Sequence, residues 1–202
     1  MTTLYQAPGA CSLAPLIALH AAGLPHDTAK VDLRAHQLAD GSDYYAVNPK
    51  GAVPALKLDN GDVLTENAVL LQYIADHAPN ARLIPASGID RYRQLELLNY
   101  IATEVHKGFG PLFNPATPPD VRSAAVDNLG KKFTFLAKRL DGGGFLCGDR
   151  LTAADAYLFT VLRWADLFKI DLSPWPAIVA YRERVGNEPP VKAALDEESL
   201  GR

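Results

Sequence analysis

The feature that most constrains the fold is a change of pattern near Pro79. Before this residue, short strand-like runs alternate with helical patterns. After it, strand signals nearly vanish and long helical patterns follow one another. A sheet and a helical bundle bury their apolar faces in different ways, so this change predicts two domains. We expect an α/β domain over residues 1–80, a linker over 81–88 and an all-helical domain over 89–202.

The first eighty residues contain four strand candidates and two helices. The strands are expected at residues 3–7, 28–33, 52–58 and 63–65. One helical face, closed by a glycine stop at Gly23, holds Leu13, Leu16, Ile17 and His20. The pair Asn60-Gly61 predicts a hairpin, and Thr65 is expected to cap a second helix that ends at Pro79. The helix between the first two strands favours a parallel pair, and the hairpin an antiparallel pair.

Composition excludes several classes of protein. Hydrophobic residues make up 48% and charged residues 21%, as in an ordinary globular chain. The net charge is −3 without a basic stripe, which argues against nucleic acid as a partner. No apolar run approaches the ~20 residues that span a membrane, and the first ten residues show no signal-peptide pattern. The two cysteines form neither a metal spacing nor a disulfide framework, so we expect no metal and a reduced, cytoplasmic setting.

Cys11 lies directly before the first helical pattern. Pro15 lacks an N–H and is tolerated only in a first helical turn, so the helix begins near Ser12. The positive end of the helix favours a thiolate at Cys11, which suits a reactive thiol. The alternative is a small buried hydrophobic residue. Cys147 lies in an apolar run before a turn and is expected to serve packing alone.

Residues 48–67 hold a second group of candidates. Pro54 opens a strand, and a cis bond there would turn the backbone of Val53 toward a ligand that pairs like an added strand. An ordinary edge proline is the alternative. Glu66 and Asn67 lie in the first turn of the next helix, where an acidic residue simply complements the helix dipole. They could equally hold a ligand that carries both an ammonium and a carboxylate group.

The helical region offers one candidate stripe and one cap. Asn99, Thr103 and His106 share a polar face, which is either a solvated surface or the wall of a site. Thr152 and Asp155 form a capping box, with aspartate in place of the usual glutamate. We therefore expect Asp155 to serve folding rather than ligand binding.

Five segments occur in order along nearly the whole chain, from about Leu4 to Pro190. They read "APGACSL", "NPKGAVPAL", "DNGDVLTEN", "NYIATEVHKGF" and "CGDRLTAADAYLFTVLRWA". Together they resemble a cytosolic glutathione S-transferase, and among its classes the bacterial beta class, which has a cysteine at the N-terminal catalytic position. The resemblance implies a thioredoxin-like N-terminal domain of order βαβαββα and an all-helical C-terminal domain that carries the hydrophobic co-substrate site. It also implies glutathione bound between the domains and a homodimer.

The resemblance further implies roles for individual residues. Cys11 would lie beside the glutathione sulfur, with His106 as the second catalytic residue. The backbone of Val53 would pair with the cysteinyl part of glutathione, and Glu66 with Asn67 would hold its γ-glutamyl end. The full set of implied glutathione-binding residues is Tyr5, Cys11, Ser12, His36, Val53, Pro54, Glu66, Asn67, Asn99, Thr103, Glu104, His106 and Lys107.

His36 departs from the family pattern, which often has lysine at this position. A neutral imidazole carries no full charge near pH 7, so glutathione affinity is expected to be weaker or more dependent on pH. The alternative is a solvated loop residue without a role in binding.

The expected function is activation of the glutathione thiol for attack on a small hydrophobic electrophile. Thiol–disulfide exchange or peroxide reduction through a Cys11 mixed disulfide is an alternative, and without a C-x-x-C motif it needs a second glutathione. A non-catalytic, ligand-binding member of the fold is a third reading. The sequence does not identify the co-substrate. Residues 107–119 are expected to border its pocket, and loops of this kind vary freely with the substrate.

Overall fold

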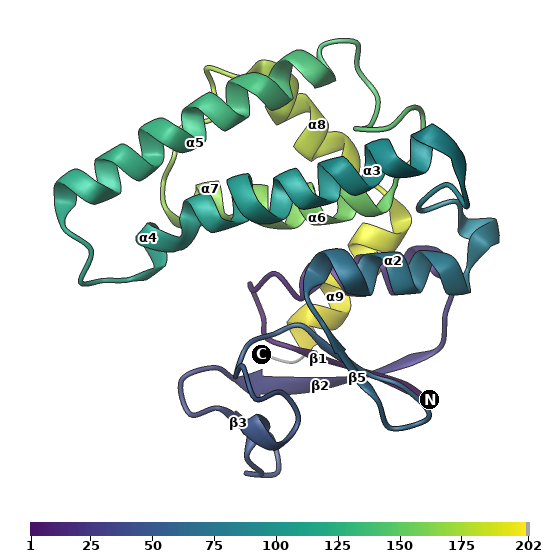
Figure 1. Ribbon diagram of the computed structural model, residues 1–202. Helices are drawn as coiled ribbons and strands as arrows, with labels where there is room; N and C mark the ends of the chain where they lie inside the picture. Colours follow the sequence, from purple (N-terminus) through teal and green to yellow (C-terminus); the bar gives the residue numbers. More distant parts are fainter. Residues whose placement is uncertain (201–202) are drawn as a thin grey trace.

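A computed structural model describes residues 1–200 and places a mixed sheet beneath a layer of helices (Figure 1). The sheet has the order β3-β2-β1-β4-β5. Its strands are β1 (Thr2–Gln6), β2 (His26–Asp32), β3 (Gln37–Leu38), β4 (Ala55–Lys57) and β5 (Val63–Thr65). β1 and β2 are parallel across helix α1 (Leu13–Ala22), whereas β4 and β5 form the antiparallel hairpin that Asn60-Gly61 predicts. The thioredoxin-like N-terminal domain is therefore confirmed.

Two details of this domain differ from expectation. No α-helix forms between β2 and β4, where the expected order placed one; this segment holds β3 and a 3-10 turn, η1 (Tyr44–Ala46). Helix α2 (Asn67–His77) begins one residue later than predicted, because Thr65 still belongs to β5 and Glu66 occupies the cap position. Glu66 has a φ of 73°, in the left-handed region, so the chain turns sharply between strand and helix.

The rest of the described chain is helical, which confirms the second half of the expected fold. Its first long helix, α3 (Gly88–Tyr100), continues through a π-helical turn over Ile101–His106 and a 3-10 turn over Lys107–Phe109. Shorter and longer helices follow: α4 (Gly110–Phe113), α5 (Pro119–Leu140), α6 (Ala153–Leu162), α7 (Trp164–Leu167), α8 (Pro176–Gly186) and α9 (Pro189–Leu200). No helix of the described residues is long and apolar enough to cross a membrane.

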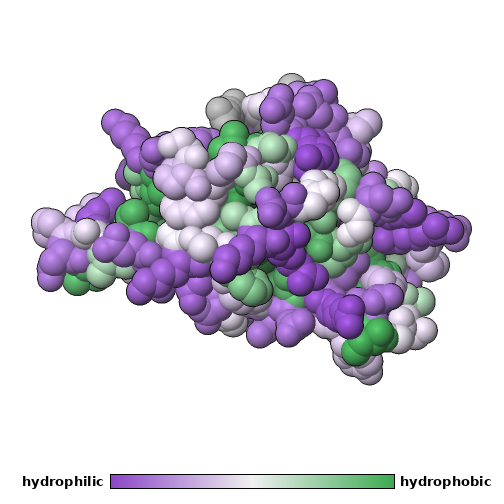
Figure 2. Space-filling view, turned by 90° about the horizontal axis from the view of Figure 1, so that it is seen from above, coloured by the Kyte–Doolittle hydropathy of each residue, from purple (hydrophilic) through white to green (hydrophobic). Residues whose placement is uncertain are grey.

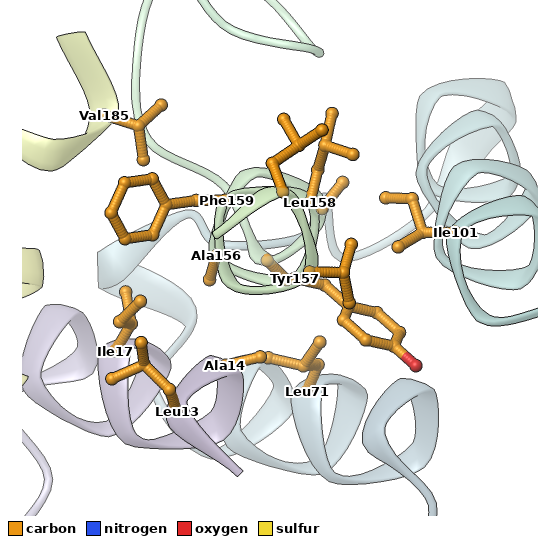
Figure 3. Packing of buried hydrophobic residues seen from close by; sticks show 14 of the residues in the cluster. Leu13, Ala14, Ile17, Leu71, Ile101, Ala156, Tyr157, Leu158, Phe159 and Val185 are labelled. Atoms are coloured by element: carbon orange, nitrogen blue, oxygen red, sulfur yellow. The ribbon is translucent and has the colours of Figure 1, made fainter. Parts of the chain in front are cut away.

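Helix α6 joins the two halves into one hydrophobic core. All of its residues are buried, and a single core cluster runs from β1 to α9. In Figure 3, Ala156 and Tyr157 face α1 and α2, where Leu13, Ala14, Ile17 and Leu71 lie. Leu158 points to the opposite side, and Phe159 points sideways toward Val185. The domain boundary at residues 81–88 stays a prediction. The structure shows that residues on both sides of it belong to one core cluster.

The face seen from above is largely hydrophilic, with hydrophobic surface between the polar side chains (Figure 2).

Candidate active site

Two adjoining cavities lie between the sheet and the helical layer. The first has a volume of about 310 Å³ and mixed walls with many polar groups, and the second, of about 360 Å³, is mainly apolar. Cys11, Ala52, Val53 and His106 line both cavities. The first is also lined by Asn48, Lys50, Pro54, Thr65, Glu66, Asn67, Ala102, Lys107 and Tyr157. The second is completed by Ala10, Leu33, His36, Gly51, Phe113 and Trp164.

The Cys11 thiol lies at the junction of the two cavities, just before α1. Its Sγ donates to the carbonyl oxygen of Val53 over 3.3 Å. The Val53-Pro54 bond is cis, which decides between the two alternatives that the sequence left open. Burial raises the pKa of Cys11 to about 11, although a hydrogen bond from Asn67 and the charge of Lys107 act in the opposite direction. This direction runs against the expected thiolate at Cys11, because the loss of hydration outweighs the groups that favour the charged form.

The loop before Cys11 is fixed from the far end of the chain. Gly9 N–H donates to Glu198 Oε1 on α9 over 3.0 Å, and Trp164 Nε1 donates to the Gly9 carbonyl over 2.9 Å. Glu198 is buried and also pairs with Arg163 over 3.3 Å. Sequence reasoning missed these residues, because nothing along the chain connects a C-terminal glutamate with a loop near the N-terminus.

At the polar end of the first cavity, Glu66 stands at the N-terminus of α2. Its Oε1 accepts from Lys50 Nζ over 2.5 Å, and both side chains are largely exposed. Asn67 Nδ2 donates to the Cys11 carbonyl over 3.2 Å, while its buried Oδ1 has no hydrogen-bond partner among the described residues. An exposed ion pair contributes little to stability, so Glu66 is readily available to a cationic ligand.

His106 forms the wall opposite Cys11. Its Nδ1 lies 2.7 Å from the Tyr157 hydroxyl, and its ring packs edge-on against Trp164 at 4.9 Å. Burial and the neighbouring charge of Lys107 lower the pKa of His106 to about 4, so the ring is neutral near pH 7. Sequence reasoning assigned Tyr157 no role because it lies in an apolar run. A buried tyrosine hydroxyl normally has a hydrogen-bond partner, so a tyrosine within an apolar run could have been predicted to contact a polar side chain.

His36 lies on the rim of the apolar cavity. Its ring packs at a tilt against Tyr45 with 4.5 Å between centroids, and its buried Nδ1 has no hydrogen-bond partner among the described residues. Gly51, with φ of 64°, permits this packing, since a Cβ there would lie 2.7 Å from Tyr45.

Five of the implied binding residues line neither cavity. Tyr5 is buried beside Tyr44, and the Ser12 hydroxyl bonds to both the N–H and the carbonyl of Ala7. Asn99 and Thr103 are exposed, and Glu104 pairs with Lys132 over 2.5 Å. Their roles in binding stay predictions. Across the described residues, one group of side chains is suited to hold a metal ion, and it lies away from both cavities, between α1, β2 and α9.

The geometry defines a thioredoxin-like sheet with a cysteine before α1, joined to an all-helical layer across a two-part cavity. Family models agree: the N-terminal domain of glutathione S-transferases matches residues 9–77, and the C-terminal domain matches residues 100–189. Glutathione S-transferase GstA of Escherichia coli O157:H7 is 47% identical, with 98% of each chain covered. The chain belongs to the glutathione S-transferase family.

Solved structures identify the class more closely. A sphingomonad glutathione S-transferase complexed with glutathione superposes with a TM-score of 0.94 at 43% identity, over 98% of this chain and 99% of that one. The bacterial beta class enzyme of Sphingomonas chungbukensis gives a TM-score of 0.94 at 42% identity, with the same coverage. The chain is thus a glutathione transferase of the bacterial beta class.

Proposed function

We propose that this enzyme joins glutathione to a small hydrophobic electrophile, with the Cys11 thiol as a hydrogen-bond donor to the glutathione sulfur. The observation that carries the proposal is the position of Cys11 at the junction of the polar and apolar cavities. A sulfur atom held there by the polar cavity faces whatever fills the apolar one, which Phe113 and Trp164 help to line. This arrangement brings thiol and electrophile together, and proximity of this kind accelerates a bimolecular reaction.

The polar cavity suits a γ-glutamyl peptide. The Val53 backbone borders it ahead of the cis Pro54, so an extended peptide can pair there like an added strand. Glu66 would take the γ-glutamyl ammonium in place of Lys50, and the free N–H groups at the start of α2 would take the carboxylate. His36, on the rim of the neighbouring cavity, would lie nearer the glycine end.

Three groups would stabilise the glutathione thiolate. The Cys11 thiol donates to the Val53 carbonyl, and an N–H of bound glutathione would compete for the same oxygen. The S–H of Cys11 would then be free to donate to the glutathione sulfur. The Tyr157 hydroxyl lies 2.7 Å from Nδ1 of His106. If the hydroxyl donates, the neutral ring carries its proton on Nε2, which would then be a donor. Lys107 adds positive charge at the cavity wall. Each charge-assisted hydrogen bond contributes roughly 1.5–3 kcal/mol, which corresponds to about one to two pKa units.

A neutral Cys11 favours this role over disulfide exchange. With a pKa of about 11, roughly one thiol in ten thousand is ionised at pH 7, and exchange needs the thiolate. The raised pKa of Cys11 therefore disfavours the redox mechanism. A cytoplasmic location and a homodimer stay predictions.

The test compares variants of Cys11 in the conjugation of glutathione to a chlorinated dinitrobenzene. Cys11→Ala removes the donor and should lower kcat/KM by about 10-fold to 100-fold. Cys11→Ser keeps a donor that cannot form a disulfide, and it should retain most of the activity. Cys147→Ala is the matched control. Cys147 lies in the loop before α6 and lines neither cavity, so its loss should leave kcat/KM unchanged. If the serine variant is as inactive as the alanine variant, the donor role is wrong.

A further inference from the structure

A cluster of two histidines and a glutamate lies away from both cavities. His20 is in the last turn of α1, His26 begins β2, and Glu197 is on α9. Glu197 Oε2 is 2.8 Å from His20 Nε2 and 3.6 Å from His26 Nε2, and the candidate ligand atoms all lie within 4.8 Å of one another. The histidine rings meet edge-on with 5.2 Å between centroids. Three distant parts of the chain therefore direct nitrogen and oxygen atoms to one point.

The hydrogen bond on the far side of His26 determines what its Nε2 can do. Nδ1 of His26 lies 2.8 Å from the Leu24 carbonyl, which can only accept, so the ring proton of the neutral imidazole is on Nδ1. Nε2 then presents a lone pair to the Glu197 carboxylate. A ring nitrogen and a carboxylate oxygen 3.6 Å apart can share one cation, either a proton on Nε2 or a metal ion.

The surroundings resemble the outer shell of a metal site. A metal-binding histidine usually donates its other N–H to a carbonyl or carboxylate, as His26 does to Leu24. Ligating carboxylates are themselves hydrogen-bonded, and Thr28 Oγ1 donates to Glu197 Oε1 over 3.2 Å. The His26 side chain is 8% exposed, whereas His20 and Glu197 are 24% and 30% exposed, so the cluster is anchored within the fold and open on one side.

The separations between Glu197 and the two histidines can be compared with those around a four-coordinate ion. Bonds of about 2.0–2.1 Å in a tetrahedral site place ligand atoms about 3.3–3.4 Å apart. The separation of 3.6 Å between His26 and Glu197 is close to this value. The 2.8 Å contact between His20 and Glu197 would open by about half an ångström, which a partly exposed glutamate side chain permits.

We propose that His20, His26 and Glu197 bind one divalent transition-metal ion of the zinc type, with water at the fourth position. Two imidazoles and a carboxylate form a ligand set that zinc commonly takes. The expected absence of a metal rested on cysteine spacing, which says nothing about histidines. A bound metal ion would link α9 to α1 and β2. The neighbouring residue on α9, Glu198, accepts a hydrogen bond from Gly9 in the loop before Cys11.

Binding is measured on the purified chain, stripped with a chelator and titrated with Co²⁺ and then Zn²⁺. We expect one ion per chain, visible absorption bands of tetrahedral Co²⁺ that Zn²⁺ abolishes, and a rise in Tm of about 5–10 °C at a Zn²⁺ concentration 100 times Kd. His26→Gln and Glu197→Gln should each weaken binding by more than about 100-fold, since even loss of an outer-shell partner costs 10-fold to 100-fold. Both variants keep a polar side chain of similar size, and circular dichroism verifies their folding.

Two controls separate this site from other ligands in the chain. His77→Gln removes an exposed histidine of α2, and Cys11→Ala removes the thiol beside His106; neither should change the metal affinity. Absence of binding in the wild type overturns the proposal. So does affinity that survives Glu197→Gln and His26→Gln, or affinity that disappears in Cys11→Ala and thereby places the ion in the active site.

Discussion

Replacement of Asp155 by alanine should destabilise the fold severely. The carboxylate is fully buried at the start of α6 and accepts four hydrogen bonds. Its donors are Leu146 N–H at 2.8 Å, Thr152 N–H at 2.9 Å, Thr152 Oγ1 at 2.5 Å and Tyr181 O–H at 2.9 Å. The capping box that the sequence predicted is thus present, and it also ties the preceding loop and α8 to α6.

The size of the effect follows from the donors that alanine leaves behind. Both backbone N–H groups become buried without a partner, at a cost of roughly 1–3 kcal/mol each. The hydroxyls of Thr152 and Tyr181 can rotate, and they add less. A total loss of about 3–5 kcal/mol in the free energy of unfolding is expected, which for a chain of this size lowers Tm by about 6–20 °C.

Thermal and urea unfolding, followed by circular dichroism, measure the effect of Asp155→Ala. Asp155→Asn keeps the volume and one acceptor and should fall between alanine and wild type. Asp149→Asn is the matched control, because that side chain is 89% exposed, and it should change the free energy of unfolding by less than about 0.5 kcal/mol. An alanine variant with a wild-type Tm would refute the reasoning. A normal Tm with lost glutathione binding would instead assign Asp155 to the site.

Two further predictions concern ionisation. In a Cys147→Ala background without ligand, the rate of Cys11 alkylation should rise with a midpoint near pH 11, and a midpoint at or below 9 would contradict the burial argument. His106 is held neutral with a pKa of about 4 against 6.5 when unfolded, so below pH 6.5 the unfolded chain binds more protons than the folded one. Its stabilising contribution of up to about 3 kcal/mol is therefore present above pH 6.5 and lost between pH 6.5 and 4. Urea unfolding of wild type and His106→Gln checks this, and equal slopes with pH would show that another group titrates.

Local signals in the sequence were reliable where one segment contains all the determinants. Gly23 ends α1 in the left-handed conformation, and Asn60-Gly61 lies at the turn between β4 and β5. Thr152 and Asp155 form their box three residues apart. In each case the partners of the backbone groups lie within a few residues, so the pattern of residues alone specifies the structure.

The ionisation state of Cys11 could not be predicted in this way. Its position before α1 is visible in the sequence, but its pKa depends on how much water the packing of α2 and α6 removes. The same holds for His106, which becomes a neutral group paired with Tyr157 only when α6 packs beside the π-helical turn. Desolvation is a property of the assembled core and has no counterpart in sequence spacing.

The sequence by itself determined the two-part fold, the cysteine before α1 and the position of Pro54 at the start of a strand, whereas the cis form of the Val53-Pro54 bond is seen only in the structure. Only the tertiary structure decided which side chains share a cavity, and it brought Glu198 to the loop before Cys11 and Glu197 to His20 and His26. The physical reason is distance along the chain. Periodicity and capping are set by neighbouring residues, whereas these contacts join β2 and α1 to a helix more than a hundred and fifty residues further on, and only the packed core places them together.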